Sequence, residues 1–369
     1  MDGSQVNQAM TPKALNRALL ARQMLLSRKK ATALSVVERL VGLQAQQARP
    51  PFVGLWSRVE GFEREELLKL LTARKVVRAT LMRGTLHLMS ARDYLAFRPA
   101  LQPMLSLGMT SVLRDRTKDL NVDEIAAVAR KMFDHRPGTF AELRRHLANS
   151  FPNGDERAMG YAVRTFLPLV TTPDDATWGF RTDSSFALAE SWIGKLLSSR
   201  EQTKSLVLRY LEGFGPATAA DVKTWSGLQG AQAILDALRP KLLVSRDERK
   251  RELFDLPQAP RPEEDTPAPP RFIAAFDNLV LSHADRSRII PEEYRARIVT
   301  KNLQVLPTFL VDGFVAGTWE SKTARNVATL TVSPFAPLAK PVKAQLSEEA
   351  ERLVRFVEPE ATKFEVTFA

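Results

Sequence analysis

Residues 76–89 read VVRATLMRGTLHLM, two apolar stretches rich in β-branched side chains on either side of Arg83-Gly84. Such side chains favour strands, and a glycine between two short apolar runs favours a tight turn. We therefore predict a β-hairpin at these residues.

The residues before this hairpin carry helical patterns. Residues 11–27, 36–46 and 65–74 place apolar side chains three and four positions apart, as amphipathic helices do. Helices followed by a hairpin in this order are typical of a winged helix, a helix-turn-helix variant in which the hairpin is the wing.

The end of the second helical pattern is unusual. Residues 42–51 read GLQAQQARPP, with three glutamines in four positions. On an ideal helix Gln44 and Gln46 lie about 200° apart, so they share a face only if the helix unwinds. Pro50-Pro51 favours such unwinding, because residues before proline leave the α region. Extended backbone would put both glutamines on one side, with Ala45 turned away.

The helix-and-strand order recurs further along the chain. Residues 137–147 read PGTFAELRRHL and residues 215–228 read GPATAADVKTWSGL, and in the second of these Thr218 is the expected N-cap. Each follows a helical pattern and precedes another helix and a strand pair, expected at 167–172 with 178–181 and at 242–245 with 251–256. We predict tandem winged helices; the alternative is a set of unrelated helical hairpins.

These patterns divide the chain. A stiff linker is expected where six prolines fall within 14 residues, and strand patterns dominate after it. The fold class is α+β, and the last domain is expected to form part of a β-barrel. The predicted units are winged helices at 1–105, 106–200 and 201–256, the linker at 257–270, and an α+β domain at 271–369.

The composition and motifs of the chain exclude several kinds of site and of protein. The chain of 369 residues has no cysteine, which excludes disulfides and thiolate metal sites. No apolar run approaches the roughly 20 residues that span a bilayer, and no signal-peptide pattern begins the chain, so we expect a cytoplasmic protein with no membrane partner. The four histidines lack the spacing of metal ligands, and no Walker loop is present. We expect neither a metal nor a cofactor.

Most of the excess positive charge lies in the first predicted unit. The net charge is +11, and residues 1–105 hold 17 Lys and Arg against 7 Asp and Glu, a balance of +10. A locally basic unit is typical of proteins that bind nucleic acid. The alternative is that an arginine-rich protein is basic without a specific partner.

Several polar side chains are candidate site residues. Those expected to contact DNA lie in the glutamine stretch and on the hairpin, although a structural hydrogen bond is the favoured alternative for the histidine: Gln47, Arg49, Arg78, Arg83 and His87. A second polar group either lines a site or fastens the last domain to the rest of the chain: Asp277, His283, Asp285 and Arg286.

Taken together, these motifs resemble the AlkZ-like winged-helix DNA glycosylases. The resemblance rests on Gln44-Ala45-Gln46, on the hairpin, on Gly215-Pro216-Ala217-Thr218, on Phe276-Asp277 and on Asp312-Gly313, which occur in the family's order along nearly the whole chain. It implies a C-shaped fold around double-stranded DNA and removal of N7-alkylated purines, including bulky adducts or interstrand crosslinks. It also assigns the catalytic role to Gln44 and Gln46.

The implied chemistry suits neutral amides. A purine alkylated at N7 is cationic and already a good leaving group, so the remaining task is to place a water against C1′. A glutamine carbonyl can accept a hydrogen bond from that water and orient it. We therefore expect a monomeric, monofunctional glycosylase. The alternative is a non-catalytic winged-helix DNA-binding protein or transcriptional regulator, although regulators usually dimerise on palindromic sites.

Overall fold

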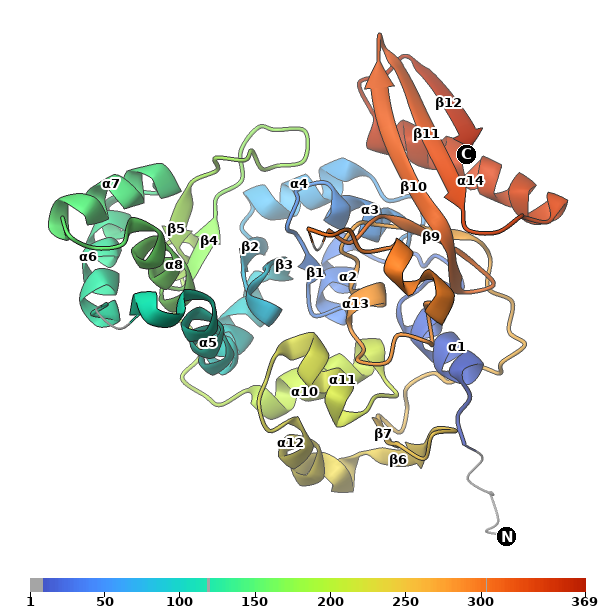
Figure 1. The fold of residues 1–369 in the computed structure, drawn as a ribbon, viewed down its shortest axis with the longest axis horizontal. Coiled ribbons are helices and arrows are strands. Elements are labelled where there is room, and N and C mark those ends of the chain that lie inside the picture. Colours follow the sequence, from blue (N-terminus) through green and yellow to red (C-terminus); the bar gives the residue numbers. More distant parts are fainter. Residues whose placement is uncertain (1–8, 118–119, 303) are drawn as a thin grey trace.

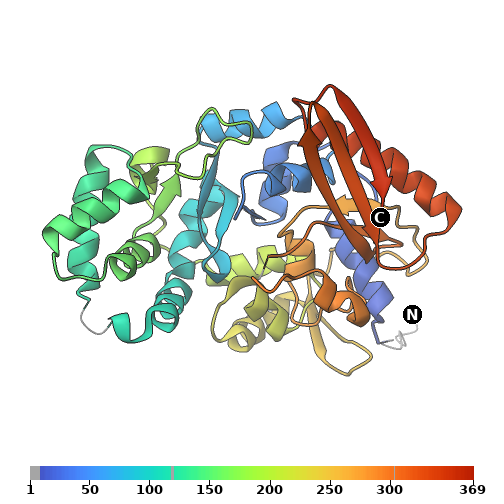
Figure 2. The ribbon, with the colours of Figure 1, turned by 45° about the horizontal axis from the view of Figure 1, so that its top comes forward.

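The computed structural model describes residues 9–117, 120–302 and 304–369. It has the predicted α+β composition. Figures 1 and 2 show the helices over residues 122–150 at one end of the molecule and the C-terminal sheet at the other. Within the described residues, no helix combines the length and the apolar character needed to cross a bilayer.

The first group of elements runs from residue 12 to residue 90. Its order is helix, helix, strand, helix, helix, strand, strand: α1 (Pro12–Arg22), α2 (Ala33–Arg39), β1 (Leu43–Gln44), α3 (Pro50–Trp56), α4 (Arg64–Thr72), β2 (Val76–Thr80) and β3 (Leu86–Ser90). The helix predicted over 36–46 is therefore wrong beyond Arg39. Helix α3 was not predicted, and it occupies the place of an expected loop.

The predicted hairpin forms, but it lies inside a sheet. Strands β2 and β3 pair around the short 3-10 turn Met82–Gly84, and the sheet has the order β1-β3-β2-β4-β5. β4 (Leu169–Thr171) and β5 (Phe186–Leu188) come from the next group. Both long edges of the hairpin are thus occupied by other strands, and its strands do not form a free wing.

The second group is helical, and α5 connects it to the first. α5 (Ala91–Leu113) passes through the predicted boundary at residue 105 without a break. α6 (Val122–His135), α7 (Phe140–Ser150) and α8 (Glu156–Phe166) follow, and then β4 and β5. The strand predicted at 178–181 is wrong: these residues belong to a loop, where the Asp174 carboxylate accepts hydrogen bonds from the amides of Ala176 and Arg181.

After α9 (Ala189–Ile193), the third group follows the predicted order. It consists of α10 (Thr203–Phe214), α11 (Ala219–Ser226), α12 (Ala231–Leu238), β6 (Leu243–Arg246) and β7 (Glu252–Asp255). The predicted N-cap is confirmed, because Thr218 and Asp221 exchange side-chain and backbone hydrogen bonds in a capping box.

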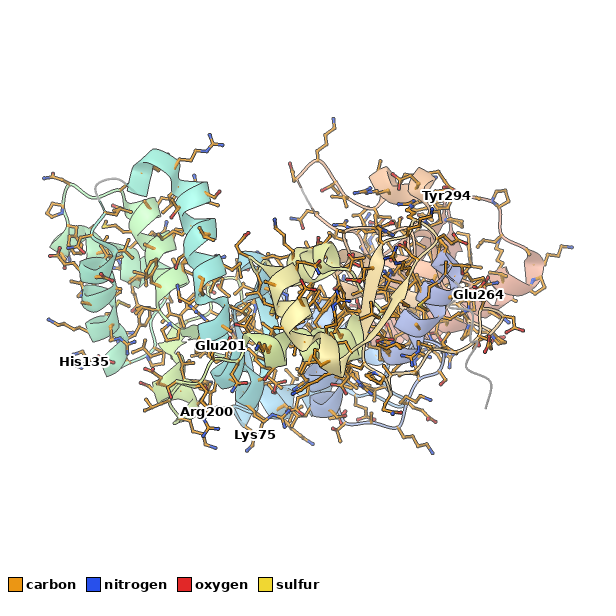
Figure 3. All side chains as sticks on the ribbon, turned by 90° about the horizontal axis from the view of Figure 1, so that it is seen from below. Lys75, His135, Arg200, Glu201, Glu264 and Tyr294 are labelled. Atoms are coloured by element: carbon orange, nitrogen blue, oxygen red, sulfur yellow. The ribbon has the colours of Figure 1, made fainter. Side chains whose placement is uncertain are left out.

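Residues 257–270 contain neither helix nor strand and lie against α1. Arg22 donates to the carbonyl of Pro260, and Arg17 donates to the carbonyl of Thr266. In Figure 3, Glu264 of this segment lies beside α1, whose Thr11 N-cap donates to it. The predicted linker therefore packs on the first group.

The C-terminal region forms an open sheet with the order β12-β11-β10-β9-β8. The part-barrel prediction is wrong, because β8 and β12 lie at opposite edges and do not pair. The elements are β8 (Arg271–Ile273), α13 (Asn278–Leu281), β9 (Thr308–Val311), β10 (Phe314–Ala324), β11 (Val327–Pro334), α14 (Lys340–Val357) and β12 (Lys363–Phe368). Asp312 and Gly313 both have positive φ, as a tight turn between β9 and β10 requires.

The described residues form several hydrophobic clusters, including separate ones for the second group and for the C-terminal sheet. One further cluster is shared by the first group, the third group and the C-terminal region. Leu19 of α1, Tyr210 of α10 and Leu279 of α13 belong to a single cluster of buried side chains. This shared cluster packs the first group, the third group and the C-terminal region against one another.

Candidate active site

The glutamine loop, residues 42–49, begins where α2 stops. The helix ends at Arg39, and the next turn contains Val41 at φ 52° and Gly42 at φ 102°. A Cβ on Gly42 would lie 2.8 Å from the carbonyl oxygen of Leu88, so only glycine fits. The helix thus ends eleven residues before Pro50, and the predicted cause of unwinding is wrong. Pro50 instead begins α3, where its missing N–H costs nothing.

The two candidate catalytic glutamines are fixed by the same hairpin. Gln44 lies on β1 opposite His87 and is 8% exposed; its Oε1 accepts a 2.7 Å hydrogen bond from Nη2 of Arg83. Gln46 is exposed, and its Oε1 accepts a 3.3 Å hydrogen bond from the amide of Leu86. Because both partners are donors only, each amide must turn its oxygen toward the hairpin.

Arg83 connects this loop to distant parts of the chain. Its Nη1 donates to the carbonyl of Trp225 at 2.6 Å, and its Nη2 also donates to Oδ1 of Asn278 at 3.2 Å. Burial and the charge of Arg286 lower the pKa of Arg83 to about 10, so it remains a cation at neutral pH. The guanidinium was predicted to face DNA; it bonds inside the protein and orients Gln44.

Arg78 holds the loop backbone. Its guanidinium is 8% exposed and donates to the carbonyls of Ala45 and Gln46 at 3.0 and 3.3 Å. The same group lies 4.9 Å from the ring centre of Phe180. Burial and the charge of Arg164 lower the pKa of Arg78 to about 10. Its predicted role as an exposed DNA contact is therefore corrected to that of a buried cation beneath the loop.

His87 is 0% exposed and cannot reach a phosphate from this position. Its Nδ1 lies 3.0 Å from the carbonyl of Thr85, which requires that nitrogen to donate. Burial, with a smaller effect of Arg83, lowers the pKa of His87 to about 3, so the ring is neutral at physiological pH. The predicted DNA contact is replaced by the structural alternative.

Gln47 and Arg49 complete the loop in different ways. Gln47 is exposed beside Gln46. Arg49 forms a 2.9 Å ion pair with Glu358 and also donates to the Ser321 hydroxyl. Arg49 thus fastens the end of the loop to the C-terminal sheet, and its guanidinium is not free for a phosphate in this arrangement.

Part of the second polar group is a docking contact. Asp277 accepts two hydrogen bonds of 2.9 Å from Arg58, and the two side chains are almost fully buried. The ring of His283 is also buried and bonds the carbonyl of Phe214 at 3.0 Å. These residues join the C-terminal region to the first and third groups, which is the fastening alternative.

Asp285 and Arg286 differ from each other. Asp285 pairs with Arg249 and Arg251, so it also serves docking. Arg286 forms no ion pair among the described residues, and its charge acts on Arg83. The charge of Arg286 therefore acts on the residue that bonds Gln44.

A cleft of about 760 Å³ opens beside the loop. Gln46 and Gln47 line it together with residues of β2, β4, α7 and α8. Three of its arginines, Arg144, Arg164 and Arg181, were not predicted from the sequence. They belong to a part of the chain that is nearly neutral overall, and only the fold brings them to the loop.

The arrangement favours positioning over proton transfer. Among the described residues, no carboxylate bonds to Gln44, Gln46 or Arg83. The nearest titratable ring, His87, has a pKa too low for a base at neutral pH. Two fixed neutral amides, surrounded by arginines, can orient a small polar molecule without changing charge.

Comparison with known proteins agrees with the sequence resemblance. The family model "DNA glycosylase AlkZ-like" matches residues 37–356. A curated relative from Streptomyces sahachiroi, "Interstrand DNA cross-link repair glycosylase", is 25% identical over 365 residues, covering 91% of this chain and 94% of the relative. The solved structure of Streptomyces sahachiroi DNA glycosylase AlkZ superposes with a TM-score of 0.79 at 20% identity, over 98% of this chain and all of the other. The fold, the ordered motifs and the match across most of its length show that this chain belongs to the AlkZ-like DNA glycosylase family.

Proposed function

We propose that this protein is a DNA repair glycosylase that hydrolyses the N-glycosidic bond of N7-alkylated purines in duplex DNA. Membership of the AlkZ-like family supports the glycosylase activity. The observation that carries the finer proposal is the pair of fixed amides, Gln44 and Gln46, of which Gln46 lines a cleft. The name of the Streptomyces sahachiroi relative supports interstrand crosslinks as a further substrate.

The amides keep the capacity that a hydrolytic water requires. Each glutamine oxygen uses one acceptor position, toward Arg83 or toward the amide of Leu86, and retains a second one. A water that donates to both oxygens is held in place while its own oxygen attacks C1′. Positioning of this kind supplies a large part of a catalytic rate without a strong base.

The substrate supplies the remaining driving force. Alkylation at N7 makes the purine cationic, so the C1′–N9 bond breaks with little help from a general acid. Electrons of that bond neutralise the departing base, and the water gives its proton to solvent after adding to C1′. A site built from neutral amides therefore selects cationic purines and acts slowly on normal ones.

The proposed partner is double-stranded DNA, bound by a monomer. The helix-and-strand groups containing β2 and β3, β4 and β5, and β6 and β7 are proposed to be tandem winged helices, as their element order favours. Binding should then weaken steeply with salt, because released counterions contribute to affinity.

Single-turnover release of base from a duplex with one N7-methylguanine tests the proposal. Gln44→Ala combined with Gln46→Ala should lose release and keep DNA binding. Gln345→Ala, at an exposed glutamine on α14, is the matched control and should act like wild type. Equal rates for wild type and the double variant would reject the catalytic assignment.

The same experiment separates the alternative function. A non-catalytic regulator would release no base from any lesion, including nitrogen-mustard adducts, and would prefer one undamaged sequence. A lesion panel and a binding selection with random duplexes, run on the same protein, distinguish the two functions.

A further inference from the structure

The cleft beside Gln46 combines three kinds of wall. The glutamine loop forms one side, strands β2, β4 and β5 form the floor, and α7, α8 and the 172–185 loop close the rest. Its lining includes aromatic rings and guanidiniums: Arg78, Phe140, Arg144, Arg164, Phe180, Arg181 and Phe186.

The positive charge in this cleft is not balanced. Arg181 pairs with Asp175, whereas among the described residues no carboxylate lies within ion-pair distance of Arg78, Arg144 or Arg164. Asp183, an exposed residue, is the acidic side chain in the lining. Uncompensated cations of this kind attract an anion.

Two of the buried arginines elsewhere in the chain have carboxylate partners. Arg22 is fully buried against Asp255, and Arg58 is fully buried against Asp277. Arg78 is 8% exposed but donates only to backbone carbonyls. Burying a cation without a counter-charge costs free energy, which a bound anion would recover.

Arg164 places a second cation next to Arg78. Its charge contributes to the lowered pKa of Arg78, and burial lowers the pKa of Arg164 itself. Its one hydrogen bond, to the carbonyl of Gly84, is 3.5 Å long, so most of its donors are available. A ligand with two or more acceptor oxygens fits this pair, because guanidinium groups bind phosphate oxygens in a forked geometry.

The aromatic side chains of the cleft favour a nucleotide over a small inorganic anion as the ligand. The rings of Phe140 and Phe186 pack edge to face at 5.1 Å, and Phe180 lies under Arg78. Apolar rings beside cations are the combination that binds a sugar and base together with their phosphate. A free inorganic anion would make no use of these rings.

We infer that this cleft binds the phosphodiester of the nucleotide adjacent to the one that Gln44 and Gln46 process. The inference rests on the proposed function, because the glutamines define which nucleotide is the target. It assigns Arg164 and Arg144 to a DNA subsite, with Arg78 as the buried cation behind them.

A phosphate scan tests the subsite through binding alone. The full chain is titrated with duplexes that contain one tetrahydrofuran abasic analogue and one neutral methylphosphonate, moved through the positions on either side. Arg164→Gln and Arg144→Gln are compared with wild type. The control is Arg352→Gln, at an exposed arginine on α14 that pairs with Glu349.

We expect each cleft variant to weaken binding roughly tenfold and to lower the slope of log Kd against log salt by about 1. At one methylphosphonate position next to the abasic analogue, wild type should lose the same factor while Arg164→Gln loses nothing further. Arg144→Gln removes an exposed side chain that has no bonded partner among the residues that the structure describes, so it tests the subsite even if Arg164→Gln disturbs the fold.

Additive losses at every position would overturn the inference, and so would coupling only at a phosphate far from the analogue. The readout is separate from base release. A protein that fails to release base but shows the coupling keeps the phosphate subsite and loses the proposed function. A protein that releases base without the coupling keeps the function and loses the subsite.

Discussion

Loss of the Asp277 carboxylate should destabilise the protein strongly. Arg58 is 0% exposed and donates two 2.9 Å hydrogen bonds to this carboxylate. In Asp277→Ala, Arg58 would keep only its bonds to the Gly54 carbonyl and to Gln23. A buried cation without its partner costs about 3–5 kcal/mol. We therefore expect the free energy of unfolding, measured by urea titration, to fall by about that amount.

Two further variants separate charge from packing. Arg58→Met with Asp277→Asn removes both charges and keeps an oxygen to cap α13, so it should be more stable than Asp277→Ala. Glu252→Ala breaks an ion pair with Arg239 that is one-third exposed or more, and it should cost no more than about 1 kcal/mol.

The result that would refute this reasoning is specific. A loss below about 1 kcal/mol for Asp277→Ala would mean that Arg58 finds water or another partner. A role of Asp277 in catalysis makes a different prediction. The double variant would then fold normally and release no base, whereas the docking role predicts release near the wild-type rate.

Four other outcomes follow from the site. Arg83→Met removes the hydrogen bond to the oxygen of Gln44. Given the proposed function, it should slow single-turnover base release about 10- to 100-fold, with a much smaller change in DNA affinity. An unchanged rate would mean that Gln44 does not need to be oriented by Arg83. Gly42→Ala places a Cβ 2.8 Å from a β3 carbonyl at positive φ, so urea unfolding should show a loss of about 1–3 kcal/mol. Burial lowers the pKa of His87 and of His283 to about 3, so just below pH 6.5 both rings bind protons in the unfolded chain and not in the folded one. The free energy of unfolding should therefore be full above pH 6.5 and fall below it by about 2.7 kcal/mol per pH unit. In urea titrations at several pH values, His87→Asn should halve that slope. Base release should vary little between pH 7 and 9, because amides do not titrate and the site arginines stay charged; a midpoint near pH 7.5 would reveal a titrating group.

Patterns among neighbouring residues were sufficient to predict some elements of the fold. The glycine turn at 83–84 and the capping pattern at Thr218 each depend on neighbouring residues, and both formed as predicted. Pairing between distant strands was harder: β4 was located, but its partner was placed at 178–181 instead of 186–188. Strand partners depend on the whole fold, and a short apolar run such as 178–181 does not reveal that a side chain like Asp174 holds it in a loop.

In the candidate site, too, some residues could be predicted from the sequence and others only from the fold. Gln44 and Gln46 stand out as residue types, so they can be selected from sequence. The roles of Arg78 and Arg83 cannot, because an arginine on a hairpin has the same sequence pattern whether it faces solvent or a backbone carbonyl. Arg164 lies in a unit without excess charge, and only the shared sheet brings it to the cleft.

Contacts from several parts of the chain hold the amide of Gln44 in the orientation that the proposed function requires. Gln44 is oriented by Arg83, which is itself fixed by Trp225 of the third group and Asn278 of the C-terminal region. Asn278 also donates to the carbonyl of Gly42, at the start of the loop. An amide gains no catalytic strength from a shifted pKa, so its contribution depends on geometry, and errors of about 1 Å cost rate steeply. Contacts from the first group, the third group and the C-terminal region together meet that requirement.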